Sequence, residues 1–461
     1  MQIYVVKQLS RIKYRSNPSL IMIMQRLNYP DATLQQPDLW GMRLIMIGFV
    51  MFSLMPYGLS WDYEGMSSLT SEGSIITKLE TGGLFLLATV LLYRNLATTI
   101  ANLRHINPFL VLSLFWCLCS AIWSPLPATT FKRVIQLYGI VMMALALQLH
   151  RNPIQLFIDT LLYSLSAILL LSLVVVIVKP SMGIDYDLGG AWRGSLSQKN
   201  ELGQIAALTV LLWQAKACYQ KLDIKYLMAG LLFSLFMLVM SKSSTSISTM
   251  LLTSFAFHLL RRQWLASSFW LLRSFLALFV IALILTFIFF MFESRLPMMS
   301  EITGPIAKLF GKGTDLTGRT DIWELVWLEI NKHPWMGLGY GSFWMGLGSL
   351  SQFVIDNLHW IPLQSHNGYL DIINEQGYIG LSFAVLTLLW QFYLLVKLAH
   401  YSKFESAFWA TAWLITVITN ATESSMLRGF LFQNIYYLFS LVFVSSSLWR
   451  YRLKDSLKSL R

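Results

Sequence analysis

Charged residues are scarce in this chain. Asp, Glu, Lys and Arg together make up 13% of its 461 residues, and hydrophobic residues make up 56%. Soluble globular domains carry about 25% charged residues. Because so few charges do not suffice to solvate the surface of a soluble protein this large, the composition excludes a soluble enzyme and predicts an integral membrane protein.

Cysteine is also rare, and motifs for binding metals or nucleotides are missing. Cys117, Cys119 and Cys218 lie in or near predicted membrane spans, so a disulfide framework is not expected. The sequence has no P-loop and no His/Cys cluster with metal-ligand spacing. We therefore predict a protein without a metal ion or another cofactor. A cleavable signal peptide is not expected, because the first 40 residues are polar and contain three prolines.

What the chain has instead is a series of long apolar runs. A run of about 17–25 residues crosses the hydrocarbon core of a bilayer as a helix. We predict about twelve such helices, which makes this an all-α integral membrane protein. The predicted spans are 42–59, 74–93, 107–123, 131–149, 154–178, 200–214, 224–240, 244–260, 268–292, 377–397, 406–421 and 430–449.

The distribution of charge predicts how these spans are oriented. Twelve spans put both termini on one side, and that side carries 22 of the 35 Lys and Arg but only 6 of the 23 Asp and Glu. Cytoplasmic loops are enriched in Lys and Arg, so we predict that both termini are cytoplasmic. The net charge of +12 then reflects topology and contact with anionic membrane lipids, and not nucleic-acid binding.

This topology divides the chain into five segments. A cytoplasmic N-terminal segment covers residues 1–41, and transmembrane helices one to nine cover 42–292. A long extracytoplasmic loop follows at 293–366, then helices ten to twelve at 367–449 and a cytoplasmic tail at 450–461. Loops longer than about 12–15 residues are usually functional or disordered. This loop is rich in Trp, Gly and apolar residues, so we expect the functional site there.

Part of the long loop is predicted to be helical. Apolar residues recur at helical spacing from Ile322 to Ile330. Asp321 followed by Glu324 fits an N-cap with its capping-box partner, and Pro334 predicts that the helix stops before it. Arg319 then lies just ahead of a helix N-terminus, where free N–H groups and the dipole favour an anion.

Three other cations near the extracytoplasmic ends of spans are candidates for binding an anionic headgroup. Arg133 lies at the start of the predicted fourth span, and Arg193 and Lys199 precede the sixth, beside the amide of Asn200. Charges this close to hydrocarbon are costly and tend to be functional or paired. The alternatives are that Arg133 is an interfacial anchor and that Glu201 neutralises Arg193 or Lys199.

Two side chains of the long loop have the chemistry for a reaction on a phosphate-linked substrate. The planar fork of Arg319 matches phosphate oxygens bidentately, unless the side chain pairs with Asp315 or Asp321. His366 lies directly before a span and is of the residue type that most often takes a proton from a hydroxyl. A single interfacial histidine is nevertheless often without function.

Two further features of the extracytoplasmic side have less specific chemistry. Gly337 and Gly339 allow the backbone to approach a partner closely, but their run is not a dinucleotide fingerprint. Asp185 and Asp187 form an acidic pair of the kind that binds a metal–nucleotide complex. We favour a solvated loop there, because nucleotide sugars are cytoplasmic and the pair is predicted outside.

The motifs around these residues resemble the O-antigen ligase and polysaccharide polymerase superfamily, the Wzy-type membrane glycosyltransferases. His366-Asn367, nine residues and Gly377-Tyr378-Ile379-Gly380 are similar to the family's His-Asn-x9-Gly-x-x-Gly signature. Roughly residues 110–430 take part, and Gln198 departs from a His that related proteins often have. The other similar motifs are Ser120–Pro125, Arg193…Lys199-Asn200…Gly203, Thr317-Gly318-Arg319 and His333-Pro334…Gly337-Leu338-Gly339. A last one, Gly339–Trp344, is closest to ExoQ-like exopolysaccharide polymerases.

This resemblance implies a substrate and a reaction. The substrate would be an oligosaccharide on undecaprenyl diphosphate at the outer face of a bacterial inner membrane. His366 would activate the acceptor hydroxyl, and cations would stabilise the charge on the leaving diphosphate without a metal ion. The implied diphosphate ligands are Arg133, Arg193, Lys199 and Arg319, with support from Asn200, Asn367, Gly337 and Gly339. Sugar-stacking platforms would be Trp323, Trp327, Trp335 and Trp344.

Three functions remain open from the sequence. The first is a polymerase that joins lipid-linked repeat units, which the exopolysaccharide-type loop pattern favours, with a chain-length regulator and export machinery as further partners. The second is an O-antigen ligase that transfers the glycan to a lipid A core or another acceptor. The third is a polysaccharide or lipid transporter, which is less favoured because the distinctive polar residues lie on one face of the membrane.

Overall fold

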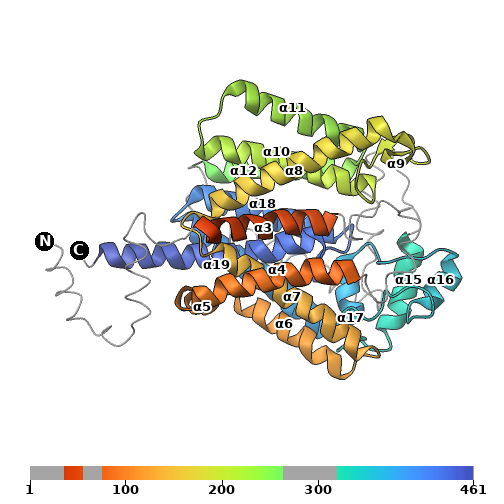
Figure 1. The fold of residues 1–461 in the computed structure, drawn as a ribbon. Helices are drawn as coiled ribbons and strands as arrows, with labels where there is room; N and C mark the ends of the chain where they lie inside the picture. The colour runs from red at the N-terminus through yellow and green to blue at the C-terminus, as the bar shows by residue number, and fades with distance from the viewer. Residues whose placement is uncertain (1–35, 55–74, 263–318, 460–461) are drawn as a thin grey trace, which may run out of the picture.

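The computed structural model describes residues 36–54, 75–262 and 319–459, and these residues are almost all helical (Figure 1). The only strands among them, β1 (Ile184–Asp185) and β2 (Ala191–Trp192), form one antiparallel pair. The helices are α3 (Gln36–Leu54), α4 (Ile75–Arg94), α5 (Leu96–Leu103), α6 (Pro108–Cys119), η2 (Ser120–Ile122), α7 (Pro127–Leu147), α8 (Pro153–Val178), α9 (Pro180–Gly183), α10 (Lys199–Tyr219), α11 (Ile224–Met240), α12 (Ser244–Arg261), α15 (Arg319–Ile330), α16 (Gln352–Leu358), α17 (Gly368–Ala399), α18 (Lys403–Asn420) and α19 (Phe432–Lys458).

The prediction of an all-α membrane protein is confirmed. Each predicted span other than 268–292, which lies outside the described residues, coincides with a helix. Of the described helices, α4, α7, α8 and α17 are long and apolar enough to cross a bilayer. The number rises to five if α5 and α6 with η2, which meet at 94°, form one span. The larger number of about twelve crossings stays a prediction.

The long helices are held together by an aromatic core. Phe157 on α8, Trp409 on α18 and Phe443 on α19 are fully buried, with ring centroids 5.0–5.2 Å apart. Aromatic pairs at such separations contribute beyond the area that they bury. This core fixes α8, α18 and α19 relative to one another, and with them the loop between α18 and α19.

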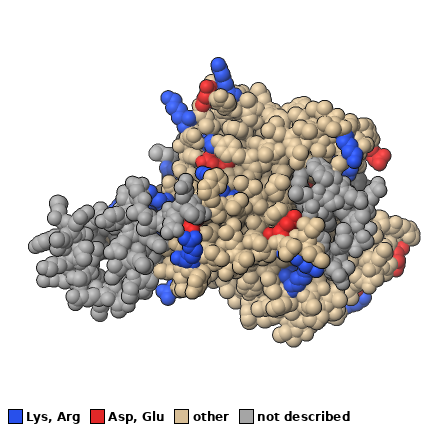
Figure 2. Space-filling view, viewed as in Figure 1, with Lys and Arg blue, Asp and Glu red and all other residues tan. Residues whose placement is uncertain are grey.

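The two ends of the molecule differ in structure. α15 and α16 lie at one end, and the C-terminal end of α19 lies at the other (Figure 1). On the face shown in Figure 2, charged side chains gather toward both ends and the band between them is mostly uncharged. This arrangement suits a protein whose middle lies in hydrocarbon and whose ends are in water.

The helix predicted in the long loop exists but begins earlier than expected. α15 starts at Arg319, so Asp321 lies in its first turn and the prediction that Asp321 is the N-cap is wrong. Arg319 therefore belongs to the helix and does not precede it. The end of the helix at Ile330, before Pro334, is confirmed.

A break in α17 is the main feature that the sequence did not predict. The helix begins at Gly368, nine residues before the predicted span, and Gly377 interrupts it with φ 67° and ψ −174°. Side chains make this backbone conformation costly, so it is essentially confined to glycine. The result is a short helical segment that lies directly behind His366.

The loop between α15 and α16 satisfies the backbone groups that the break leaves free. Leu338 N and Gly339 N donate to the carbonyls of Asn374 and Glu375 at 3.0 and 2.7 Å. In return, Tyr378 N donates to Pro334 O at 2.8 Å. Free backbone groups are expensive near hydrocarbon. The segment 334–341 therefore stabilises the broken helix by hydrogen-bonding its free backbone groups.

Replacing Gly377 with Ala is expected to lower the free energy of unfolding by roughly 2–4 kcal/mol. A Cβ there would lie 2.1 Å from Trp335 O, so strain and a backbone clash add up. Gly348→Ala is the matched control, because Gly348 has φ 72° but no atom within 4 Å of the added Cβ. Thermal melting of the purified variants measures both. Equal losses of stability at the two positions would contradict the conclusion that contact with residues 334–341 stabilises the break at Gly377.

Candidate active site

Three segments that are far apart in the sequence meet at His366. They are the loop before α17, the first turn of α15 and the loop between α18 and α19. His366 Nδ1 lies 2.8 Å from Glu423 Oε2, and Arg319 Nη2 lies 3.2 Å from Glu423 Oε1. Gln364 Nε2 donates to Glu423 Oε2 at 2.9 Å. One carboxylate thus connects the two residues that the sequence singled out.

The contact with Glu423 decides which nitrogen of His366 is available for chemistry. An ionised carboxylate only accepts hydrogen bonds, so Nδ1 of His366 must carry the proton that points at Glu423. In the neutral form of this imidazole, Nε2 is the unprotonated nitrogen, which can accept a proton. The side chains of His366 and Glu423 are 24% and 13% exposed, so the pair is reachable from solvent.

Arg319 lies in an electrostatically unusual place. It is the first residue of α15, and a cation at a helix N-terminus is opposed by the helix dipole. The ion pair with Glu423 offsets this cost. The alternative that Arg319 pairs with Asp321 is wrong, and Asp315 lies outside the described residues. The Arg319 side chain is 24% exposed, so its remaining N–H groups are available to an anionic ligand.

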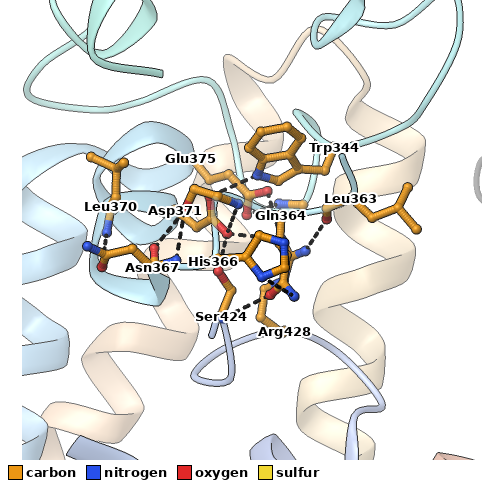
Figure 3. Close-up of polar contacts among 12 residues, drawn as sticks. Trp344, Leu363, Gln364, His366, Asn367, Leu370, Asp371, Glu375, Ser424 and Arg428 are labelled. Atoms are coloured by element: carbon orange, nitrogen blue, oxygen red, sulfur yellow. Dashed lines mark hydrogen bonds and ion pairs between the residues drawn. The ribbon is translucent and has the colours of Figure 1, made fainter. Parts of the chain in front are cut away.

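Asp371 binds the residues next to His366 and Glu423 in the sequence (Figure 3). Its carboxylate is 1% exposed and accepts hydrogen bonds from the backbone N of Ser365 at 3.3 Å and from the hydroxyl of Ser424. Trp344 Nε1 donates to the same carboxylate at 2.8 Å. Ser365 precedes His366 and Ser424 follows Glu423, so Asp371 fixes the two loops that bring His366 and Glu423 together.

Arg428 braces the other side of this network (Figure 3). Its Nη1 lies 3.9 Å from Asp371 Oδ2 and 3.7 Å from Glu375 Oε1. Its Nη2 donates to Leu363 O at 2.7 Å. Two buried carboxylates one helical turn apart would repel each other without a cation between them. Arg428 supplies that cation. Because it belongs to the loop between α18 and α19, it also attaches this loop to α17.

Arg133 lies apart from the pair of His366 and Glu423. Its Nη1 donates to Gly341 O at 2.6 Å and its Nη2 lies 3.1 Å from Met345 Sδ. These contacts attach α7 to residues 341–345, so the Arg133 guanidinium binds the protein's own chain in this structure. The same loop contributes Tyr340, whose hydroxyl accepts a hydrogen bond from Gly429 N at 3.2 Å and whose phenol pKa is raised by burial.

The second predicted cluster lies at the start of α10. Arg193 Nε donates to Met182 O at 2.7 Å and Nη1 lies 3.7 Å from Asp185 Oδ1. Asp185 is therefore an ion-pair partner, and it is 24% exposed in a loop whose next residues, including Asp187, are exposed, as the predicted solvated loop requires. Lys199 makes no ion pair within the described ranges, and it begins α10.

Two other expectations about the start of α10 are settled by hydrogen bonds. Glu201 accepts from Ser197 N and Ser197 Oγ at 3.1 and 2.6 Å, so the alternative that it neutralises Arg193 or Lys199 is wrong. Asn200 Oδ1 accepts from Ser243 Oγ at 3.2 Å. Asn200 thereby attaches the start of α10 to the start of α12.

The supporting residues of the loop have structural contacts. Asn367 caps α17, and its side chain accepts from the backbone N of Tyr369 and Leu370 at 3.1 and 3.3 Å. Gly337 and Gly339 have φ 66° and 101° and lie where a Cβ would meet backbone of α17 or Ser124. Close approach is therefore their observed property, as predicted.

The predicted sugar-stacking role does not fit the buried tryptophans. Trp323 and Trp344 are 8% and 3% exposed. Their indole N–H groups donate to Ser365 O and Asp371 Oδ1, each at 2.8 Å. Trp327 packs against the small core of the loop, whereas Trp335 is 67% exposed. Trp323 and Trp344 thus hold the active-site loops from behind.

The residues that sequence reasoning missed belong mostly to the loop between α18 and α19. Glu423 and Arg428 follow directly after an apolar run and precede another, so they are charges placed next to hydrocarbon. Such charges are usually functional or paired. The same rule, applied to every short connection between apolar runs, finds both. Asp371 and Glu375 are one turn apart in the stretch between His366 and the predicted span.

Two comparisons with known proteins complete the description of the site. Residues 229–385 match the family described as O-Antigen ligase, which confirms the predicted resemblance. The match includes α12, α15, His366 and the break in α17, and it ends before Glu423. It does not distinguish ExoQ-like polymerases from other members. No curated protein matches the chain.

Proposed function

From the match of residues 229–385 to the O-antigen ligase family, we propose that this membrane protein is a polysaccharide polymerase. It joins undecaprenyl-diphosphate-linked oligosaccharide repeat units at the outer face of a bacterial inner membrane, with both termini cytoplasmic. The observation that carries the proposal is the contact of His366 Nδ1 with Glu423 at 2.8 Å, with Arg319 on the other carboxylate oxygen. His366, the proposed base, and Arg319, the proposed ligand of the diphosphate, thus contact the same carboxylate.

The proposed reaction is a direct displacement at the anomeric carbon of the donor. His366 Nε2 takes the proton of an acceptor hydroxyl, and its oxygen forms a bond to C1 of the donor sugar. The bond from C1 to the diphosphate breaks, and its electron pair stays on the phosphate oxygen. Attack from the opposite face inverts the anomeric centre. The diphosphate bond supplies the free energy, so the reaction uses no nucleotide.

Cations stabilise the charge that develops on the leaving diphosphate. Arg319 is the principal ligand in this proposal, because its planar fork pairs with two phosphate oxygens. Lys199 adds a second charge, and Arg193 serves that role only if a ligand competes with Asp185. We assign Arg133 a positioning role through Gly341. Such preorganised charge in a site of low dielectric is a large source of rate enhancement.

Two other functions remain alternatives to polymerisation. A ligase would use the same donor and the same residues, with a lipid A core or another molecule as acceptor. A polysaccharide or lipid transporter would not need a base held by a carboxylate on one face of the membrane. The pair of His366 and Glu423 therefore supports an enzyme over a transporter.

A reconstituted reaction tests the proposal. Purified protein is supplied with undecaprenyl-diphosphate repeat units from the host, without nucleotide and with a chelator. The expected product is a ladder of longer lipid-linked glycans. If glycan passes across proteoliposomes without any new glycosidic bond, the protein is a transporter. If only added lipid A core becomes glycosylated, the protein is a ligase.

Glu423→Gln is expected to lower the turnover number by about 10²-fold. An amide keeps the shape of the side chain but can present an N–H to His366, which favours the wrong tautomer. Carboxylates that orient a functional histidine, as they do for metal-bound histidines, are typically worth about 10- to 100-fold in activity. The matched control is Glu329→Gln on α15, which loses only an ion pair with the exposed Lys332. Turnover within twofold of the unsubstituted protein would show that Glu423 does not orient His366.

A further inference from the structure

A short helix connects α4 and α6 at the end of the molecule opposite α15 and α16. This helix, α5, follows α4 directly and meets α6 with η2 at an angle of 94°. It lies at the same end as the C-terminal part of α19 (Figure 1). Because α6 runs along the bundle, a helix at a right angle to it runs across the end of the bundle. α5 is therefore parallel to the surface of a membrane that the bundle spans.

The position of α5 is fixed by hydrogen bonds from buried side chains on both sides of it. Thr99 Oγ1 donates to Leu92 O of α4 at 3.0 Å. Asn107 caps the first turn of α6, and its Nδ2 donates to Thr387 O of α17 at 3.1 Å. Thr99 and Asn107 are both buried. The bend between α5 and α6 is thus part of the packing of the bundle.

One face of α5 exposes a row of large apolar side chains. Leu96, Ile100 and Leu103 are 52%, 42% and 48% exposed, and spacings of four and three residues place them on the same face. Asn102 lies on a different face and is buried against the protein. Thr98, two residues from Ile100, lies on nearly the opposite side of the helix. Rows of exposed apolar side chains mark contact with a membrane or a partner.

Cations flank this apolar face. Arg104 directly follows the last residue of α5 and is exposed, and Arg94 is the last residue of α4. Arg94 Nη1 lies 2.8 Å from Asp38 Oδ1, but the Arg94 side chain remains 43% exposed. An apolar helix face with Arg beside it is typical of helices that lie in the interface of a membrane with anionic lipids. The charges therefore favour a lipid surface over an uncharged partner.

A tryptophan next to α5 independently marks the level of the interface. Trp40 on α3 lies two residues after Asp38, the ion-pair partner of Arg94, and is 55% exposed. The guanidinium of Arg43 lies 5.3 Å from the centroid of its ring. Tryptophan is enriched where hydrocarbon meets water. The boundary of the bilayer is thus expected at the height of Trp40 and the start of α5.

We propose that α5 is an interfacial helix that inserts Leu96, Ile100 and Leu103 into an anionic lipid surface. In the orientation proposed above this surface belongs to the cytoplasmic leaflet, and nothing else in the inference depends on the proposed function. α4 has 20 residues, or about 30 Å of helix, which matches the hydrocarbon core. With α5 held at one surface, α4 reaches the other. α5 thereby fixes the depth of the bundle and keeps the end with α15 and α16 outside the hydrocarbon.

Fluorescent labels on the two sides of α5 test the proposal. An NBD group is attached to Ile100→Cys and, as the matched control, to Thr98→Cys. Cys119 and Cys218 are replaced by Ser, whereas Cys117 is fully buried and is retained. The full chain is placed in nanodiscs of phosphatidylcholine and phosphatidylglycerol in equal parts. We expect lipids with a nitroxide near the headgroup to quench the label at position 100, and iodide in the water to quench the label at position 98.

Three results of this experiment would overturn the proposal. If iodide quenches both labels equally, the apolar face of α5 lies in water. If neither quencher reaches the label at position 100, a second copy or another segment of the chain covers this face. If a nitroxide at the end of the acyl chain quenches that label best, α5 lies in the hydrocarbon core as part of a span.

Arg104→Gln tests the contribution of charge. Nitroxide-labelled phosphatidylglycerol and phosphatidylcholine are compared as quenchers of the label at position 100, which gives the lipid preference beside α5. We expect the preference for phosphatidylglycerol to fall by about 5-fold, the usual contribution of one Arg near an anionic surface. Lys221→Gln, which removes an exposed cation between α10 and α11, is the control and should leave the preference unchanged. An equal preference with and without Arg104 would reject an anionic lipid as the partner of α5.

Discussion

Replacing His366 with Asn is expected to slow glycosidic bond formation by about 10²–10⁴-fold, the usual contribution of a general base. Asn is preferred to Ala because His366 has φ 54°, and Asn tolerates this left-handed conformation better than Ala, so the loop is less strained. The Asn side chain cannot take the proton that Nε2 takes. Affinity for the lipid-linked donor should change little, since the proposed diphosphate ligands remain. Single-turnover kinetics with saturating donor measures the chemical step directly.

His359→Asn is the control for this experiment. His359 is exposed and has φ 60°, so the same substitution is made in nearly the same backbone conformation, away from Glu423. Its activity should equal that of the unsubstituted protein. A similar loss at both positions would mean that the loop is merely disturbed. An unchanged rate for His366→Asn would reject the role of His366 as base.

Local sequence patterns predicted the helices well, because apolar runs and helical spacing are local properties. The helix after Asp321 and its end before Pro334 followed from such patterns. The break at Gly377 did not, since a single glycine in an apolar run is compatible with an unbroken helix. The break is stabilised by hydrogen bonds from the loop at 334–341, about 40 residues earlier in the chain, and no local pattern reports such contacts.

The candidate site was predicted in part. His366 and Arg319 were found from residue chemistry and motif, but nothing in the sequence said that one carboxylate joins them. Glu423 is 57 residues from His366 and 104 from Arg319, so its contacts depend on tertiary packing. The cations were harder to rank. Arg133 and Lys199 have the same local signature, yet the first bonds the protein's own backbone and the second makes no ion pair in the described part of the chain.

Arg319→Ala is expected to abolish polymer formation while the protein remains in the membrane. The substitution removes the proposed diphosphate ligand, and the binding constant for the donor should weaken by at least 10-fold, as a charged hydrogen bond to a ligand is typically worth about 1.5–3 kcal/mol. Arg319→Lys should recover part of the affinity, because it restores the charge but not the bidentate fork. Lys332→Ala removes an exposed cation two residues after the C-terminal end of the same helix and serves as control.

Arg319 could act by positioning Glu423, through their ion pair, as well as by binding the diphosphate. A double-mutant cycle separates these two roles. If Arg319 only positions Glu423, the loss in Arg319→Ala with Glu423→Gln should be no larger than the loss from Glu423→Gln alone. If Arg319 also binds the diphosphate, the double variant should lose donor affinity in addition to turnover. We expect the second result, because Glu423 already has His366 and Gln364 as partners, whereas α15 places the guanidinium of Arg319 partly exposed beside them.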